Sequence, residues 1–124
     1  MTTIMDAIGI EVIEVTNKKV VATMPVHDAT RQPFGLLHGG ASVVLAETVA
    51  SVGSLHHVDK ETEAAVGLEI NANHVRGIRE GMVKAVGIPL HLGRTTHLWE
   101  IKITDEATGK LICVSRCTIA VIKK

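Results

Sequence analysis

Apolar residues run almost without interruption through the middle of the chain and alternate with polar residues on either side of it. Between Leu36 and Val58 nearly every position is apolar or small, which predicts a long helix, roughly Gly39–Val58, buried on almost every side. The preceding residues predict a short helix near Ile4–Ile8 ended by Gly9, strands at Ile10–Thr16 and Lys19–Pro25 joined at Asn17-Lys18, and a loop at Val26–Leu37.

After Asp59–Glu63 the alternation predicts strands to the end of the chain. The first strand shows the alternation clearly, with Val66, Leu68, Ile70 and Ala72 on one face and Gly67, Glu69, Asn71 and Asn73 on the other. Further strands are expected at Met82–Pro89, through Trp99, Ile101 and Ile103, and at Lys110–Ile122. The expected turns are Arg79–Gly81, Leu92–Arg94 and Glu106–Gly109. The last strand is apolar on both faces, so we expect it at the centre of its sheet or near a subunit contact.

One long buried helix and five or six mostly antiparallel strands predict an α+β domain in which a curled sheet wraps the helix. A single curled sheet covers most of such a helix but leaves one flank open. That flank is expected to pack against a second copy of the chain, so the pattern predicts an obligate dimer.

The length of 124 residues suits one domain, residues 1–124, with one core. Hydrophobic residues make up 46% and aromatics 2%, so the core must consist of Val, Ile, Leu and Ala, and stacking surfaces for single-stranded nucleic acid are missing. Thirteen basic residues balance thirteen acidic ones, which argues against nucleic-acid or anionic-membrane partners.

No signal-like or membrane-spanning stretch is visible, and we expect a cytoplasmic protein. Cys113 and Cys117 share a face of the last expected strand but lie too far apart to form a disulfide. They are interpreted as buried small side chains in a reducing compartment.

Glu47 is the only Asp, Glu, Lys or Arg between Arg31 and Asp59. An unpaired carboxylate in an apolar helix costs several kcal/mol, so its presence favours a catalytic use. Two alternatives stay open: a buried structural carboxylate bonded to backbone or to an arginine, and a narrow solvent stripe shared with Ser51 and Ser54, which follow at i+4 and i+7.

The start of the long helix favours the catalytic interpretation. His38-Gly39-Gly40 opens it, and paired glycines at a helix start leave the first N–H groups accessible to a ligand, where the helix dipole favours negative charge. That environment suits a carbonyl oxygen that becomes an oxyanion. With Glu47 two turns further along, the segment predicts an acyl-transfer site.

Three blocks of sequence resemble the hot-dog-fold acyl-CoA thioesterases: QPFGLLHGGASVVLAE (Gln32–Glu47), VGLEINANHVR (Val66–Arg76) and PLHLG (Pro89–Gly93). The likeness is greatest to the phenylacetate-pathway-like branch, which includes 1,4-dihydroxy-2-naphthoyl-CoA, 4-hydroxybenzoyl-CoA and enterobactin-proofreading thioesterases. It implies a hot-dog domain, dimers whose sheets join side by side, tetramers formed from two dimers, and active sites that lie across the dimer interface.

The same resemblance implies roles for individual residues. Glu47 corresponds to the family's catalytic carboxylate, acting as nucleophile or as general base, and the Gly39 N–H to the group that polarises the thioester carbonyl from the other subunit. Gln32 and His38 correspond to residues that contact or orient the thioester, and Ser51 to a position that contacts water or the acyl group.

Coenzyme A carries phosphates, which basic side chains and glycine-rich loop amides bind. The expected contacts are Gly67, the segment His74, Val75, Arg76 and Gly77, and the later turn of His91, Leu92, Gly93, Arg94, Thr95 and Thr96. An ordinary turn with solvated charges is the alternative for both segments, and a strand-end surface histidine is the alternative for His74. His27 and His97 are expected at the surface, and His56 and His57 are expected to close the helix.

The predicted function is hydrolysis of an aromatic acyl-CoA, of hydroxybenzoyl, gentisyl or dihydroxynaphthoyl type, to the free acid and coenzyme A. The rivals are a hot-dog hydratase or dehydratase and a non-catalytic acyl-CoA-binding protein. No metal site is expected because no His, Cys or Asp spacing suits one, and the resemblance implies no cofactor beyond the coenzyme A of the substrate.

Overall fold

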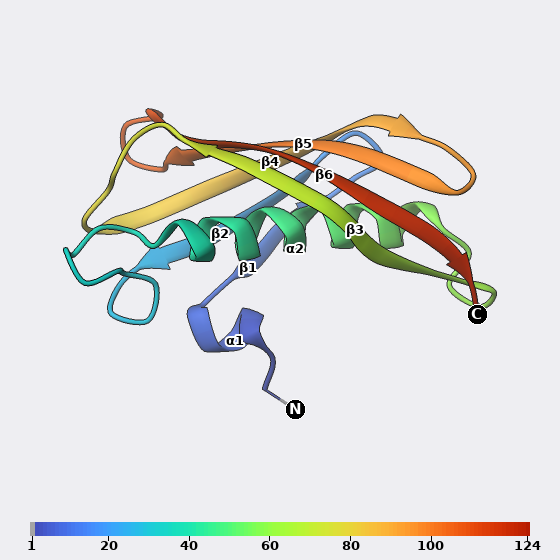
Figure 1. Ribbon diagram of the computed structural model, residues 1–124, viewed down its shortest axis with the longest axis horizontal. Coiled ribbons are helices and arrows are strands. Elements are labelled where there is room, and N and C mark those ends of the chain that lie inside the picture. The colour runs from blue at the N-terminus through green and yellow to red at the C-terminus, as the bar shows by residue number, and fades with distance from the viewer. Residues whose placement is uncertain (1) are drawn as a thin grey trace.

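A computed structural model describes residues 2–124, which form a six-stranded antiparallel sheet curled around one long helix (Figure 1). The elements follow the chain as α1 (Ile4–Ile8), β1 (Glu11–Val15), β2 (Val20–Val26), α2 (Gly39–His57), β3 (Glu63–His74), β4 (Gly81–Leu92), β5 (Thr96–Asp105) and β6 (Leu111–Lys123). The strand order is β1-β2-β4-β5-β6-β3 and the sheet is not closed. The hot-dog fold and its elements are therefore confirmed.

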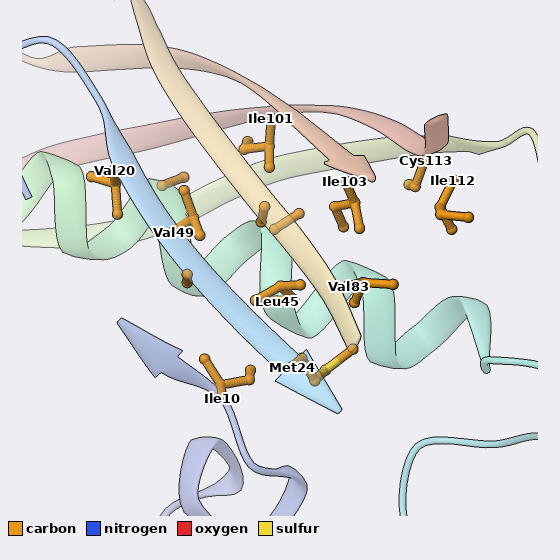
Figure 2. Packing of buried hydrophobic residues seen from close by; sticks show 14 of the residues in the cluster. Ile10, Val20, Met24, Leu45, Val49, Val83, Ile101, Ile103, Ile112 and Cys113 are labelled. Atoms are coloured by element: carbon orange, nitrogen blue, oxygen red, sulfur yellow. The ribbon is translucent and has the colours of Figure 1, made fainter. Parts of the chain in front are cut away.

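The core lies between α2 and the concave face of the sheet. Leu45 and Val49 of α2 are fully buried there among aliphatic side chains of the strands, as Figure 2 shows for part of the cluster. Ile101 and Ile103 of β5 point inward as the alternation predicts. Among residues 2–124 no helix has the length and hydropathy needed to cross a bilayer.

Trp99 of β5 is the largest buried side chain, and its ring fits against α2 only because the helix carries a glycine at that point. A Cβ atom on Gly53 would lie 2.3 Å from the Trp99 ring carbon Cη2, and two other ring carbons would lie within 2.9 Å. The close approach of helix and strand at this end of the domain therefore depends on Gly53.

The Gly53→Ala substitution is expected to lower the free energy of unfolding. Overpacking a filled core costs about 1–3 kcal/mol, which exceeds the ~1 kcal/mol gained from replacing glycine by alanine in a helix. Urea unfolding followed by circular dichroism at fixed protein concentration measures the difference. Ser51→Ala, on the same helix but half-exposed, is the control, and equal stability of the two variants would contradict this account.

The alternation expected for Val66–Asn73 is interrupted in β3. The pairing with β6 shifts between Gly67 and Glu69, so Leu68 is an extra residue in a β-bulge. A shift of one residue exchanges the two faces of a strand. Ile70 and Ala72 pack against the core as expected. Val66 and Leu68, by contrast, are 42% and 64% exposed.

β6 lies inside the sheet, between β5 and β3, which agrees with the central position predicted for the last strand. Cys113 and Cys117 are both buried and free. Burial raises the pKa of the Cys113 thiol, and burial together with the charges of Glu47 and Glu69 raises the pKa of Cys117 to about 12. Both side chains therefore remain protonated thiols at neutral pH.

Two expectations about polar residues near the end of α2 are wrong. Ser54 does not share an open face with Glu47: it is fully buried and bonded to side chains of β5. His97 is not at the surface but 4% exposed. The same side of α2 meets β3 near Glu47 and β5 near Ser54, so one helical face has two different environments.

Candidate active site

Glu47 lies on α2 and is half-exposed in the single chain, less buried than the sequence suggested. Its carboxylate lies against β3, where a Cβ atom on Gly67 would be 2.5 Å from Oε2 of Glu47. No hydrogen bond or ion pair to the Glu47 side chain occurs within residues 2–124. The alternative of a structural carboxylate bonded to backbone or arginine therefore does not apply to the single chain, and the bulge at Gly67 makes room for the carboxylate.

A cavity of about 390 Å³ adjoins this carboxylate between α1 and α2. One helical stripe of α2 forms its floor, and the start of α1 forms a wall; the lining residues are Thr3, Ile4, Met5, Val44, Glu47, Thr48, Ser51 and Val52. Ser51 is thus on the same cavity as Glu47. The apolar members were not singled out from the sequence, because side chains that line a cavity have the same composition as core side chains.

The start of α2 presents one free backbone donor. The His38 ring caps the helix, with Nδ1 accepting from the Gly40 N–H at 2.8 Å. The Gly39 N–H donates to no group within the described part of the chain, as is usual for the first turn of a helix. A Cβ atom on Gly39 would lie 2.9 Å from Nε2 of His74, so the backbone here is both accessible and closely flanked by an imidazole.

The loop before α2 holds Gln32 in a defined orientation. Its side-chain oxygen Oε1 accepts from the backbone N–H of Phe34 at 2.5 Å and of Leu36 at 3.3 Å. Arg79 steadies the same loop by donating from Nη1 to the Phe34 carbonyl at 3.0 Å. Since the oxygen is engaged with the loop, the amide nitrogen of Gln32 is the end available as a donor.

A second cavity of about 390 Å³ brings this loop, the helix start and the end of β3 together. Its lining includes Gln32, Leu36, Gly39, Ser42, His74, Val75, Arg76 and Gly77. The predicted residues of the helix start and of the His74–Gly77 segment are therefore neighbours. His74 itself is an exposed strand-end residue, but one that lies on this cavity.

The two cavities are separate within one chain. Gly39 and Glu47 are eight residues apart on one helix, which places them about 12 Å apart along its axis. Gly67 and His74 are seven residues apart on β3, or about 23 Å along the strand. We refer to the cavity beside Glu47 as the carboxylate half-site and to the cavity beside Gly39 as the amide half-site.

The turn between β4 and β5 lies at the carboxylate end of the domain. Thr96 pairs with Ala120 of β6 on one side, and Gly67 pairs with the adjacent Ile119 on the other, so the turn and Gly67 flank the same part of β6. Figure 1 shows this turn at the same end as the C-terminus and the start of α2 at the opposite end. Within one chain the turn therefore does not meet Arg76 and Gly77.

A small cavity of about 160 Å³ beside this turn contains two cationic side chains. Arg94 and Thr95 come from the turn and Lys123 from the end of β6, with Glu63 of β3 opposite them. Lys123 was not predicted from the sequence, because only the pairing of β6 brings the C-terminal end to this turn. The exposed His91 and Leu92 precede the turn, and Gly93 lies under the His91 ring.

Comparison with known proteins agrees with this architecture. The family model described as "Thioesterase superfamily" matches residues 34–112. The chain is 50% identical over 121 residues to the 1,4-dihydroxy-2-naphthoyl-CoA hydrolase of Listeria monocytogenes, covering 98% of this chain and 97% of that protein. It is 57% identical over 101 residues to the 1,4-dihydroxy-2-naphthoyl-CoA hydrolase of Escherichia coli, covering 82% and 73%.

A solved structure of a mutant thioesterase from Pseudomonas aeruginosa superimposes with a TM-score of 0.95 at 48% identity, covering 98% of this chain and 87% of that one. The matched region contains the start of α2, Glu47 and the turn between β4 and β5. Fold, sequence family and structural neighbours thus agree: the chain belongs to the thioesterase superfamily and is a thioester hydrolase of the hot-dog fold.

Proposed function

We propose that this protein hydrolyses an aromatic acyl-CoA to the free acid and coenzyme A at a site shared by two copies of the chain. The observation that carries the proposal is the separation of the two half-sites. An unpaired carboxylate at Glu47 and a free N–H at Gly39 are complementary for thioester hydrolysis, yet on one helix they lie about 12 Å apart and cannot act on one carbonyl group.

The exposed edge of β3 offers a way to bring the half-sites together. β3 ends the strand order, and its hydrophobic residues Val66 and Leu68 are exposed in the single chain. Antiparallel pairing of two copies of β3 about Ile70 and Asn71 would place Gly67 of one copy opposite His74 of the other. In that arrangement Glu47 faces the Gly39 N–H of the second copy, and two equivalent sites form. The proposed assembly is a tetramer of two such dimers.

Two chemical routes use the same groups. In one, Glu47 takes a proton from water, the water oxygen bonds to the carbonyl carbon, the C–S bond breaks, and the sulfur of coenzyme A receives the proton. In the other, a Glu47 oxygen bonds to the carbonyl carbon, coenzyme A leaves as the thiolate, and water then hydrolyses the mixed anhydride. In both, the Gly39 N–H of the second copy stabilises the oxyanion.

The remaining predicted residues have supporting positions in this scheme. The His38 ring holds the first turn of α2 in place by accepting from Gly40, so it orients the neighbouring Gly39 N–H. Gln32 offers its amide nitrogen to the thioester, since its oxygen is engaged by the loop. Ser51 lies one turn beyond Glu47 on the same cavity, where its hydroxyl can contact the acyl group or water.

The proposed substrate class rests on the acyl cavity and on the relatives. Two similar proteins are named 1,4-dihydroxy-2-naphthoyl-CoA hydrolases. The cavity beside Glu47 has a volume of about 390 Å³ and combines apolar walls with the hydroxyls of Thr48 and Ser51. The Ser54 hydroxyl, expected on this face from the helical spacing, is absent from it. A compact cavity with hydroxyl partners suits a hydroxylated ring better than a long alkyl chain.

Hydroxylated benzoyl-CoA or dihydroxynaphthoyl-CoA is expected to exceed palmitoyl-CoA in kcat/KM by ~10-fold or more, since each unpaired polar contact costs about 1–3 kcal/mol. A panel of aromatic and aliphatic acyl-CoAs assayed for thiol release measures the ratio. Unsubstituted benzoyl-CoA is the control for ring hydroxyls. If palmitoyl-CoA were hydrolysed equally well or better, the aromatic assignment would be wrong while the thioesterase activity stood.

The same panel separates the rival functions. A hydratase or dehydratase would change an enoyl chromophore without releasing thiol, and a binding protein would retain acyl-CoA without turnover. We place the activity in the cytoplasm, in agreement with two buried cysteines that are free thiols.

A further inference from the structure

A chain of buried polar side chains links α2 to β5 at the end of the domain that carries Glu47. Ser54 Oγ lies 2.8 Å from Nε1 of Trp99 and 2.8 Å from Nδ1 of His97. All three residues are buried, with exposed fractions of 0% for Ser54 and Trp99 and 4% for His97. Since an indole N–H only donates, Ser54 Oγ accepts from Trp99, and the same oxygen is hydrogen-bonded to the His97 ring.

His97 joins this network of buried side chains to the turn between β4 and β5, because it is the second residue of β5. The Gly93 N–H of this turn donates to the Thr96 carbonyl at 2.9 Å, and Thr96 directly precedes His97. Burial lowers the pKa of His97, the charges of His57 and His91 lower it further, and Glu63 opposes them, so the neutral ring predominates at pH 7.

The other side of this turn carries the cationic cavity. The Thr95 carbonyl accepts from the Val121 N–H at 2.9 Å, which ties the turn to β6. Arg94 and Thr95 line the cavity of about 160 Å³ with Lys123. The turn is therefore held by backbone bonds to β6 on one side and by the buried side chains of α2 and β5 on the other.

We propose that Ser54 and His97 are positioning residues that hold the turn between β4 and β5, and with it Arg94 and Thr95, in place for the phosphate groups of coenzyme A. This inference rests on the proposed function. Ser54 follows Glu47 by seven residues on α2, or about 10 Å. One rigid helix therefore sets the spacing between the carboxylate that acts on the thioester and the turn that receives the far end of the substrate.

The test compares two thioesters of the same aromatic acid, one of coenzyme A and one of N-acetylcysteamine, which has no phosphates. Ser54→Ala is expected to raise KM for the coenzyme A thioester about 10-fold, the scale of a displaced binding group. It should leave kcat for that substrate, and kcat/KM for the N-acetylcysteamine thioester, within about twofold of the unaltered protein.

Ser115→Ala is the matched control. Ser115 is also buried, at 1% exposure, and donates one hydrogen bond at 2.7 Å to the Asn71 carbonyl, but it has no contact with the turn. It should leave both substrates unaffected. His97→Asn, which replaces the imidazole bonded to Ser54 with a shorter amide, is expected to repeat the KM effect and gives a second measurement if the Ser54 variant does not fold.

Equal losses on the two thioesters, or an unchanged KM for the coenzyme A thioester in both variants, would overturn the positioning role. Failure of the unaltered protein to release thiol from either substrate would instead contradict the proposed function itself. The two failures are therefore distinguishable in one experiment.

Discussion

Glu47→Gln is expected to lower kcat by at least ~10²-fold, the lower end for loss of a general base, while the protein stays folded. The carboxylate has no hydrogen-bond or ion-pair partner within residues 2–124, so removing its charge leaves no group unpaired in the single chain. Glutamine keeps the shape of the side chain but neither accepts a proton nor forms an anhydride at neutral pH. Thiol release measures kcat, and circular dichroism shows whether the variant stays folded.

Glu69→Gln is the matched control for this substitution. Glu69 lines a small cavity together with Glu47 and Gly67, but its side chain is bonded to Asn71. It should change kcat little, because it lies beside the bulge without facing the amide half-site of a second copy. If the Glu47→Gln protein kept most of its activity, Glu47 would have a structural role and the proposed mechanism would be wrong.

Mixing inactive Glu47→Ala and Gln32→Ala proteins is expected to restore activity, because a shared site takes its carboxylate from one copy and its amide groups from the other. In a hybrid dimer one site carries both substitutions and the other carries neither. With random exchange half the dimers are hybrid and half their sites are intact, so activity should reach about one quarter of that of the unaltered protein. Thiol release after subunit exchange measures the recovered activity of the mixture.

A mixture of Gln32→Ala and Gly39→Ala proteins is the control. Both substitutions fall in the amide half-site, so a hybrid dimer has one damaged group in each site and activity should stay absent. Mass spectrometry of the mixtures establishes that subunits have exchanged. No recovery in the first mixture despite exchange would mean that each active site lies within a single chain.

Local pattern was sufficient to predict the elements and the main catalytic candidate. The uninterrupted apolar segment predicted α2 to within one residue at its end, because a helix buried on almost every side is apolar at nearly every position along its length. The lone charge at Glu47 and the glycines at Gly39 and Gly40 indicated a catalytic site, because packing of a buried helix requires neither a charge nor paired glycines. The Ser51 position followed from helical spacing.

Other predictions depended on which strand meets which face of the helix, and local pattern does not contain that information. Ser54 has nearly the same angular position on α2 as Glu47, yet it meets Trp99 and His97 of β5 rather than an open cavity. His97 was expected at the surface because the strand was predicted to begin near Trp99, whereas β5 begins at Thr96. Once the strand is extended to Thr96, the alternation of Trp99, Ile101 and Ile103 places His97 on the same buried face. Register in β3 was equally hidden, since a bulge at Leu68 leaves no mark on the alternation.

By itself the sequence determined the class of fold, the positions of its helix and strands, and the candidates for an acyl-transfer site, because these follow from periodicity and from the energetic cost of polar groups in apolar segments. The resemblance of three sequence blocks to a known family added that the bond cleaved is a thioester. Only the tertiary structure decided how those residues are distributed. Packing of α2 across a curled sheet places Glu47 and the turn of Arg94 at one end and Gln32, Gly39 and His74 at the other. Such long-range placement depends on strand order and register, which residues distant in the sequence establish together.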